Sequence, residues 1–486
     1  MWQEDMGMTV RWLSPAQVTA LVATPPLTSP AYLDLARRLR LHIVDGRVSP
    51  GVRMPSERAL AVALGVSRST ITSAYAHLTE EGYLRAQVGS GSFVRLPRVR
   101  RPSSAPGADP DSDPISLTTA SGPAPAGLAS AFDRAAGRLP EILGLSGYLP
   151  DGLPELRERI AERFTVRGLP TDPQQVIVTS GALAALNIVL RTLVGPGDRV
   201  LLESPTYPAA IDAVRRSGAR PVAYPLGPDG WQADDVNLSL RQSAPRLAYL
   251  TPDFHNPTGL TMSEGARADV AAALKRNRTT AVIDETLVEL RLDGEETADP
   301  PPLAAWLPEA ITVGSASKAF WGGLRIGWIR APLELVPALV ETRAADDLGS
   351  AVFEQLVTAE LLADPDAVLT GYRDRVRRQR DHLVAEVSRV LPEWTFSRPS
   401  GGLSLWLQLP TEISTQLAAV SEQHGLVLTA GPRFFVGGGG ERHLRVPYTA
   451  DPPVLSRAVQ RLLRLWHAVR TGQRVTGPAP RMRLTA

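Results

Sequence analysis

Only two of the 52 lysines and arginines in this chain are lysines, namely Lys275 and Lys318. An arginine keeps its proton near neutral pH, whereas a lysine that loses its proton can attack a carbonyl group and form a Schiff base. Lys275 lies in 275-KRNR-278, at the end of a helical apolar pattern, which is typical of a solvated surface lysine. Lys318 follows the apolar run 311-ITV-313 and a series of small residues. Since a solvated position fits Lys318 badly, we predict a Schiff-base lysine there.

Small and basic residues at predicted strand ends are candidates for a phosphate site. Residues 180–182 lie where a predicted strand passes into a predicted helix, so their backbone amides and the helix dipole favour a bound phosphate. Two further candidates flank Lys318: Ser315 lies three residues before it and Arg325 seven residues after it. The predicted phosphate-binding residues are Ser180, Gly181, Ala182, Ser315 and Arg325.

A carboxylate and an aromatic ring complete the set. Asp284 ends the apolar run 281-AVID-284, where a carboxylate is costly unless it meets a cation such as a protonated pyridine nitrogen. Tyr207, in 203-ESPTYP-208, offers a face on which a ring can stack. A capped helix, a paired aspartate and a core tyrosine are the plainer explanations of the single features. Together with Lys318, however, they fit one cofactor, pyridoxal 5′-phosphate.

Composition excludes several other kinds of site. The chain has no cysteine, which excludes disulfides, thiolate nucleophiles and cysteine-ligated metals, and its seven histidines show no metal-ligand spacing. We therefore expect no metal. No apolar run approaches the ~20 residues of a membrane-spanning helix. With 43% hydrophobic and 21% charged residues, the composition is that of a soluble globular protein, which we expect in the cytoplasm.

The first hundred residues differ in charge from the rest of the chain. Residues 1–101 hold thirteen arginines and seven acidic residues, a net charge of +6, so the remaining residues carry −4. The front end is thus suited to a polyanion. Its apolar spacing predicts helices over 30–45, 55–65 and 68–82, with Tyr32 and Leu35 on the apolar face of the first, and a hairpin over 84–94.

The second and third of these helices have the spacing of a helix-turn-helix. Ser56 and Ser67 are predicted N-caps, and Gly65 is a predicted helix end. A small helical domain without a nucleic-acid role is the alternative. The third helix would present four residues to DNA near its N-terminus: Arg68, Ser69, Thr70 and Thr72.

A series of motifs in the order of the GntR family resembles the GntR-type winged helix-turn-helix: Gly46, 50-PGVRMPSERALA-61, 65-GVSRSTI-71, 82-GYL-84 and 89-GSGSFV-94. This resemblance implies that double-stranded operator DNA is approached by three residues, Arg58, Arg68 and Gly89. A basic residue common in that family one turn after Arg68 is replaced here by Thr72, which leaves the base preference open.

The composition also predicts the division of the chain. A DNA-binding domain spans residues 28–96, and the Pro-rich stretch 97–115 is a tether, either lying along DNA or a plain spacer. In residues 116–470, β-like runs alternate with helical patterns, which predicts an α/β fold with a largely parallel sheet covered by helices. The tail, 471–486, has no assignment.

Residues 116–470 resemble fold type I aminotransferases through 148-YLPDGLPELR-157, 179-TSGALAAL-186, 254-FHNPTG-259, 315-SASK-318 and 322-GGLRIGW-328. This resemblance implies a smaller C-terminal α+β domain and a homodimer with shared sites. It also implies that Lys318 carries the cofactor, Asp284 pairs with the pyridine nitrogen and Asn256 bonds the ring hydroxyl. Two further roles are implied, for Tyr148 at the phosphate of the partner subunit and for Arg445 at a substrate carboxylate.

Joined, the two parts resemble MocR-type transcriptional regulators, and some segments are similar to the YczR-like branch of that group. Relatives carry a tyrosine two residues after the ring-nitrogen aspartate, where this chain has Thr286. We expect a sensor in which an amino compound, or the cofactor itself, changes DNA binding. A working aminotransferase tethered to a DNA-binding domain is the alternative, and a domain that serves only to dimerise is a third interpretation.

Overall fold

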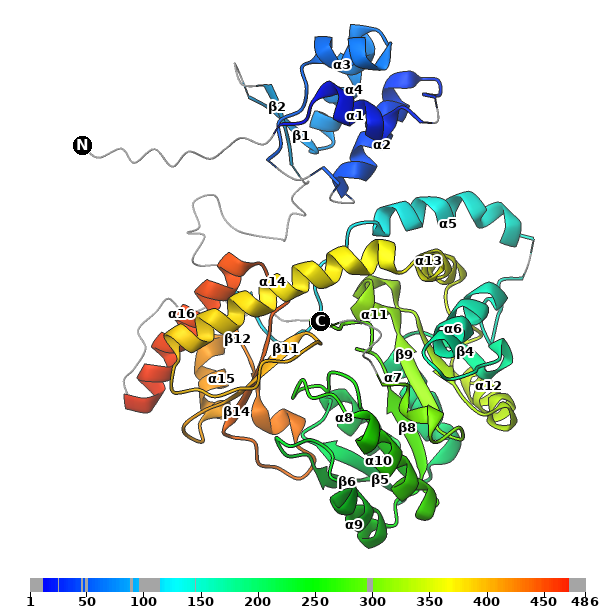
Figure 1. The fold of residues 1–486 in the computed structure, drawn as a ribbon, viewed down its shortest axis with the longest axis vertical. Coiled ribbons are helices and arrows are strands. Elements are labelled where there is room, and N and C mark those ends of the chain that lie inside the picture. Colours follow the sequence, from blue (N-terminus) through cyan, green and yellow to red (C-terminus); the bar gives the residue numbers. More distant parts are fainter. Residues whose placement is uncertain are drawn as a thin grey trace. The chain divides into compact units, whose positions relative to one another are not determined.

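The computed structural model describes residues 12–24, 26–44, 47–48, 51–87, 91–95, 114–144, 146–294 and 300–471. Gly89, most of the predicted tether and the tail from residue 472 lie outside the described residues. The chain forms two compact units (Figure 1): residues 1–108 and 125–133 make up the first, and residues 109–124 and 134–486 make up the second. Each unit is described separately.

The N-terminal unit is a winged helix-turn-helix. Its elements are α1 (Pro15–Val22), α2 (Ala31–Val44), α3 (Glu57–Leu64), α4 (Arg68–Glu80), β1 (Leu84–Gln87) and β2 (Gly91–Val94). The two strands pair antiparallel, with Leu84 opposite Val94, and so form the predicted hairpin.

Local side-chain bonds define the ends of the two central helices. The Ser56 side chain accepts a hydrogen bond from the backbone of Ala59, and the Ser67 side chain accepts one from Thr70. Gly65 ends α3 in the left-handed conformation, with φ of 65°, which costs a glycine little. The predicted caps and helix end are therefore confirmed.

The core of the N-terminal unit differs from the prediction in two places. Val18 and Val22 of α1 are fully buried in it, so the predicted start at residue 28 leaves out part of this core. Tyr32 is 37% exposed, whereas Leu35 is fully buried. Placing Tyr32 on the apolar face was therefore wrong, because the first turn of α2 extends past that core.

The C-terminal unit is built on a seven-stranded sheet with the order β4-β10-β9-β8-β7-β5-β6. The strands are β4 (Val176–Thr179), β5 (Arg199–Ser204), β6 (Arg220–Pro225), β7 (Leu247–Leu250), β8 (Thr280–Asp284), β9 (Ile311–Ser315) and β10 (Gly327–Arg330). All neighbouring pairs are parallel except those of β10, which is antiparallel to β4 and β9. The sheet is therefore largely parallel, as predicted.

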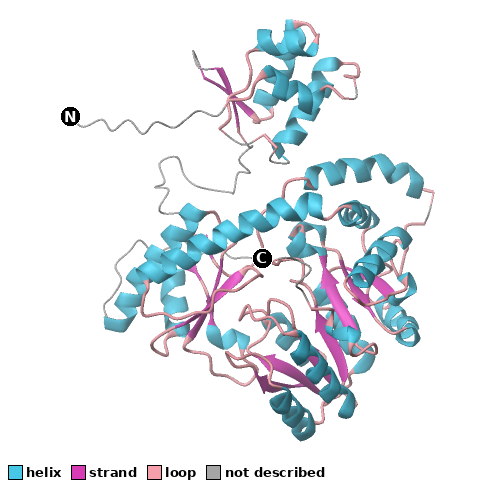
Figure 2. Ribbon diagram, in the orientation of Figure 1, coloured by secondary structure: helices cyan, strands magenta, loops and turns pink. Residues whose placement is uncertain are grey.

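Helices pack around this sheet (Figure 2). The α-helices beyond residue 116, on the sheet and in the smaller part described below, are α5 (Leu128–Ile142), α6 (Pro154–Val166), α7 (Ala182–Leu193), α8 (Pro208–Arg216), α9 (Ala233–Ser243), α10 (Glu264–Arg276), α11 (Ala316–Ala319), α12 (Val336–Ala344), α13 (Val352–Ala363), α14 (Asp366–Val390), α15 (Ser414–Gln423) and α16 (Pro452–Thr471). No described helix is long and apolar enough to cross a membrane.

A smaller α+β part follows the seven-stranded sheet. Its strands are β11 (Ser404–Gln408), β12 (Leu426–Val427), β13 (Thr429–Ala430) and β14 (His443–Pro447), and β12 pairs with β3 (Ile115–Ser116) from the start of this unit. Ile115, which the prediction assigns to the tether, is buried in the core of this part. The predicted fold class is confirmed, because a large sheet, a smaller α+β part and a winged helix-turn-helix are all present.

Candidate functional site

A cavity of about 430 Å³ lies at the strand ends of the large sheet, against the smaller part. Nine predicted residues line it: Gly181, Ala182, Tyr207, Asn256, Asp284, Ser315, Lys318, Arg325 and Arg445. Two predicted residues, Ser180 and Tyr148, are not among the residues that line it. The carbonyl oxygen of Ser180 accepts a hydrogen bond from Nη2 of Arg325 at 3.0 Å, and Tyr148 is 65% exposed.

The Lys318 side chain points into this cavity from α11. Its Nζ donates a hydrogen bond to the main-chain oxygen of Ala120 at 3.0 Å. Burial lowers the pKa of Lys318, and the nearby Arg445 and Arg325 lower it further, while Asp284 opposes them. The surroundings therefore favour the neutral amine, which is the nucleophilic form.

The Asp284 carboxylate is held at both oxygens. Oδ1 accepts a hydrogen bond from the backbone of Thr286 at 2.8 Å, and Oδ2 accepts one from the Tyr249 hydroxyl. Burial raises the pKa of Asp284, and these bonds oppose that rise. Sequence analysis missed Tyr249, since the run 247-LAYLT-251 reads as an ordinary buried strand.

The predicted phosphate site forms a tight cradle. Gly181 has φ of +105°, and a Cβ there would lie 2.9 Å from Nη2 of Arg325. Arg325 itself adopts φ of 53°, so the chain turns sharply just before β10. The Ser315 side chain accepts a hydrogen bond from the backbone of Ser317 at 3.1 Å. This arrangement places the Arg325 guanidinium beside the N-terminus of α7.

Arg445 reaches the cavity from β14, in the smaller part. Nη1 donates to Oδ1 of Asn256 at 3.2 Å, and Nη2 donates to the main-chain oxygen of Thr118. The guanidinium carbon lies 5.0 Å from the centre of the Phe434 ring. Burial lowers the pKa of Arg445 to about 10. A buried, still charged fork of this kind is suited to a carboxylate.

A buried network that sequence analysis missed supports the loop bearing Asn256. Glu203 is fully buried and accepts hydrogen bonds from Trp231 Nε1 at 2.6 Å and from the backbone of Thr251. Nε2 of His255 lies 3.2 Å from the same carboxylate. These contacts hold the loop that follows β7 against β5, and so help to fix the position of Asn256.

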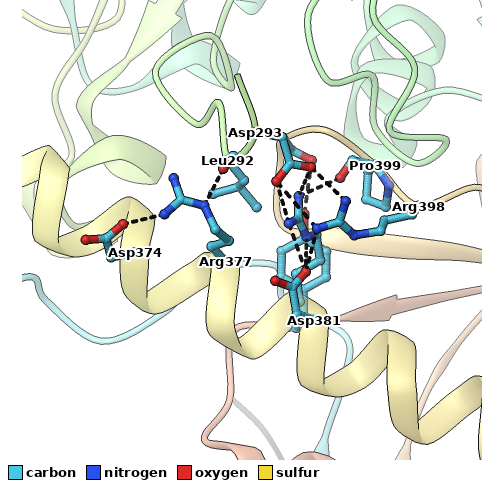
Figure 3. Close-up of polar contacts among 10 residues, drawn as sticks. Leu292, Asp293, Asp374, Arg377, Asp381, Arg398 and Pro399 are labelled. Atoms are coloured by element: carbon cyan, nitrogen blue, oxygen red, sulfur yellow. Dashed lines mark hydrogen bonds and ion pairs between the residues drawn. The ribbon is translucent and has the colours of Figure 1, made fainter. Parts of the chain in front are cut away.

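The wall formed by 401-GG-402 is supported by the ion-pair cluster of Figure 3. The side chain of Arg380, fully buried on α14, donates two hydrogen bonds of 2.7 Å to Asp293 and one of 2.9 Å to the oxygen of Pro399. Arg398 adds an ion pair to Asp293 at 3.2 Å. Figure 3 shows Asp293 beside Arg398 and Pro399, so the cluster joins two loops to α14.

The N-terminal unit carries a second candidate surface. Arg58, Arg68, Ser69 and Thr72 are exposed, and the Thr70 hydroxyl lies 2.8 Å from that of the capping Ser67. No sequence pattern indicates a role for Glu57. Its Oε2 accepts a hydrogen bond from the Thr72 hydroxyl at 2.7 Å and lies 3.7 Å from Nε of Arg68. Glu57 therefore restrains Arg68 at the start of α4.

Comparison with known proteins identifies both units. Residues 31–94 match the bacterial regulatory proteins of the gntR family, and residues 138–462 match the aminotransferases of class I and II. The chain belongs to the class I and II aminotransferase family. With a GntR-type domain in front, this aminotransferase-like chain has the organisation of the MocR-type DNA-binding regulators. Its place in the YczR-like branch stays a prediction.

Individual relatives include both regulators and enzymes. The probable rhizopine catabolism regulatory protein MocR of Rhizobium meliloti is 29% identical, over 77% of this chain and 81% of that protein. The 2-aminoadipate transaminase of Thermus thermophilus is 32% identical, over 65% and 80%. The crystal structure of LysN, an α-aminoadipate aminotransferase from the same organism, matches with a TM-score of 0.67 and 28% identity, over 74% of this chain and 93% of that one.

The aminotransferase family and its fold imply pyridoxal 5′-phosphate as the cofactor. The cavity fits it in charge, since three cationic side chains and one carboxylate line it. Two buried polar atoms of residues that line the cavity, Oγ of Ser317 and Nε of Arg445, have no hydrogen-bond partner among the described residues. A polar ligand would satisfy them, because buried polar atoms are normally bonded.

Proposed function

We propose that this DNA-binding regulator holds pyridoxal 5′-phosphate through a Schiff base on Lys318 and that ligand binding in its aminotransferase-like part alters its affinity for operator DNA. One observation carries the proposal: Lys318, Asp284, Arg325 and Arg445 line a single cavity. A side chain of each type that the cofactor and an amino carboxylate require is therefore available there.

The residues that would hold the cofactor follow from their chemistry. Asp284 would pair with the ring nitrogen, Asn256 would bond the ring hydroxyl and Tyr207 would stack on the ring. The phosphate would be held by Ser180, Gly181, Ala182, Ser315 and Arg325, joined by the partner subunit's Tyr148 in a homodimer. When bound, the cofactor supplies an aldehyde that captures amines and a ring that withdraws electrons.

The residues of this chain divide the remaining work. Lys318 offers a neutral amine because burial and two neighbouring arginines lower its pKa. Arg445 binds the carboxylate of an incoming amino compound through its paired N–H groups. If an amino compound is sensed, its amine would replace the amine of Lys318 at the cofactor and leave Lys318 as a free amine. The signal is then either the amino compound or the cofactor itself.

A working aminotransferase is the second candidate function. The coverage of 93% of the LysN chain favours it, since the aminotransferase-like part spans nearly the whole of an enzyme of that kind. Thr286 argues against full activity, because its short hydroxyl cannot take the role of a tyrosine phenol. We therefore favour sensing over turnover, and both over a domain that serves only to dimerise.

The N-terminal unit would read double-stranded operator DNA through the start of α4. The proposed contacts are Arg58, Arg68, Ser69, Thr70, Thr72 and Gly89, of which Gly89 lies outside the described residues. Arginine serves either a phosphate or a guanine edge, and the hydroxyl side chains serve phosphates or bases.

The visible absorption spectrum of the full chain with added pyridoxal 5′-phosphate tests the cofactor site. We expect a band that is absent from the Lys318→Ala variant and retained in Lys275→Ala, a matched control at the other lysine. Amines are then screened for those that shift both this band and operator binding. Sustained formation of a keto acid would favour the enzyme, and a parent without a Lys318-dependent band would refute both functions.

A further inference from the structure

The wing of the N-terminal unit is wider than the hairpin of β1 and β2. Residues 51–54, which precede α3, lie against β2, since the N–H of Met54 donates to the main-chain oxygen of Ser92 at 2.8 Å. On the other side of this segment, the N–H of Leu13 donates to the main-chain oxygen of Arg53 at 3.0 Å. Four pieces of chain therefore lie side by side, with β1 and the start of the described chain at the two edges.

One residue from each piece lies in a single row across this sheet. Arg85 of β1 is opposite Phe93 of β2. On the far side of β2, Phe93 is paired with Arg53, and Arg53 is paired in turn with Trp12. Residues that are directly opposite in neighbouring strands project from the same face of a sheet. These four side chains, here called the wing face, therefore alternate between arginine and an aromatic ring.

The two faces of the sheet differ in burial. Leu84, Val94 and Met54 each stand next in sequence to a residue of the row, are at most 3% exposed, and belong to the same core as the helices. On the wing face, both arginines are exposed and Trp12 is 65% exposed. The buried side chains hold the sheet on the core, so the arginines of the wing face are not needed for packing.

The wing face is positively charged. Residues 51–54, β1 and β2 together contain two arginines and no acidic residue. Among the residues that the structure describes, the guanidinium groups of Arg53 and Arg85 form no hydrogen bond or ion pair. A Cβ at Gly91 would lie 3.1 Å from Nε of Arg53, so the glycine in β2 leaves room for this guanidinium on the wing. The charge of the wing face is thus available to a partner.

We infer that the wing face binds the sugar-phosphate backbone of duplex DNA, with Arg53 and Arg85 each neutralising one phosphate and the Trp12 indole donating to a further backbone oxygen. This inference rests on the proposed DNA-binding function and extends it beyond the helix-turn-helix. The two arginines are two strands apart, a separation of about 10 Å. Since phosphates recur every ~3.4 Å of axis along one DNA strand, the arginines would meet different phosphates.

The chemistry of the row favours DNA over a second copy of this chain. In a symmetric dimer, the wing face of one copy would meet the same basic face of the other. Arginine and the tryptophan indole are hydrogen-bond donors without acceptor atoms, so they suit a partner that offers only acceptors at its surface. The phosphate and sugar oxygens of a DNA duplex are such a partner.

Binding to a duplex of arbitrary sequence tests the inference, because backbone contacts do not depend on the bases. The full chain is titrated against a fluorescein-labelled duplex of about 30 base pairs and mixed sequence, at several salt concentrations. Each phosphate contact contributes ~0.9 to the slope of log K against log salt. We expect Arg53→Gln and Arg85→Gln each to lower this slope by about 0.9 and to weaken binding about eightfold at ~0.1 M salt. The double variant should lose about twice as much slope.

Three further variants separate a backbone contact from other effects. Arg53→Lys and Arg85→Lys keep the charge and should keep the slope of the parent. Arg40→Ala removes a charge from α2, where Arg40 is paired with Glu81, and should keep the slope as well. Trp12→Ala should weaken binding about two- to tenfold, as the loss of one neutral hydrogen bond would give, without changing the slope.

Parent-like slopes in both glutamine variants would overturn the inference and leave DNA binding by α4 in place. A change of subunit number in the double variant, measured by sedimentation without DNA, would assign the wing face to a second copy of the chain and would overturn it too. A parent chain that binds no duplex at low salt would instead refute the proposed DNA-binding function, and the inference about the wing face with it.

Discussion

The hydroxyl of Tyr249 donates a hydrogen bond to Oδ2 of Asp284, across the neighbouring strands β7 and β8. The other oxygen of this carboxylate is bonded by the backbone of Thr286. Burial raises the pKa of Tyr249 well above its usual value, so this phenol stays protonated and remains a donor. Tyr249 therefore helps to keep a buried carboxylate ionised where the proposed ring nitrogen would lie.

Removing this bond is expected to weaken cofactor binding. Because a hydrogen bond to a charged group contributes ~1.5–3 kcal/mol, we expect Tyr249→Phe to bind pyridoxal 5′-phosphate about tenfold or more weakly. Tyr224→Phe is the control, since Tyr224 is equally buried but bonds to the backbone of Gln232. Fluorescence titration with the cofactor measures both variants, and parent-like affinity in Tyr249→Phe would contradict a role for this bond.

The reactivity of Lys318 should depend on its neighbours in a defined direction. Burial lowers the Lys318 pKa below 10.5, and the charge of Arg445 lowers it further. The rate of cofactor capture should therefore reach half its maximum at a pH below 10.5, and this pH should rise in Arg445→Gln. Stopped-flow absorbance from pH 7 to 10 measures the rate. Arg433→Gln, at an exposed arginine, is the control. An equally large shift in the pH of half-maximal rate for this variant would count against a local charge effect.

Subunit mixing tests the proposed sharing of sites. If Tyr148 of each subunit serves the partner's site, Tyr148→Ala and Lys318→Ala homodimers should both bind the cofactor poorly. Mixed dimers then contain one site with both side chains intact and one site lacking both. We expect co-refolded mixed dimers to regain about one cofactor site per dimer, measured as absorbance per isolated heterodimer. No recovery would show that Tyr148 acts within its own subunit, and parent-like cofactor binding by the Tyr148→Ala homodimer would show that Tyr148 plays no part.

Arg68 is expected to carry a direct DNA contact. We expect Arg68→Ala to weaken operator binding by ~1–3 kcal/mol if it reads a base, or to reduce the salt dependence by about one unit if it binds a phosphate. Fluorescence anisotropy with labelled operator at several salt concentrations separates these results. Arg40→Ala is the control, because Arg40 forms an ion pair with Glu81 at 3.2 Å. An unchanged affinity and salt slope for Arg68→Ala would remove this residue from the interface.

Features that depend on near neighbours in the chain were predictable. Ser56, Ser67 and Gly65 define helix ends through groups three or four residues away, so the helix-turn-helix could be placed from its spacing. The strand ends that carry Asp284 and Ser315 were likewise marked by short apolar runs. The sequence by itself thus determined the two-part organisation, most of the elements and the types of side chain that the cofactor would need.

Tertiary structure decided which groups meet. Ala120 and Lys318 are 198 residues apart, and Thr118 and Arg445 are 327 apart, so no local pattern indicates their contacts. The same holds for Tyr249, whose hydroxyl finds Asp284 only because β7 and β8 are neighbours in the sheet. Main-chain oxygens carry no side-chain signature, and strand order is set by packing of the whole core. These contacts therefore became visible only in the folded chain.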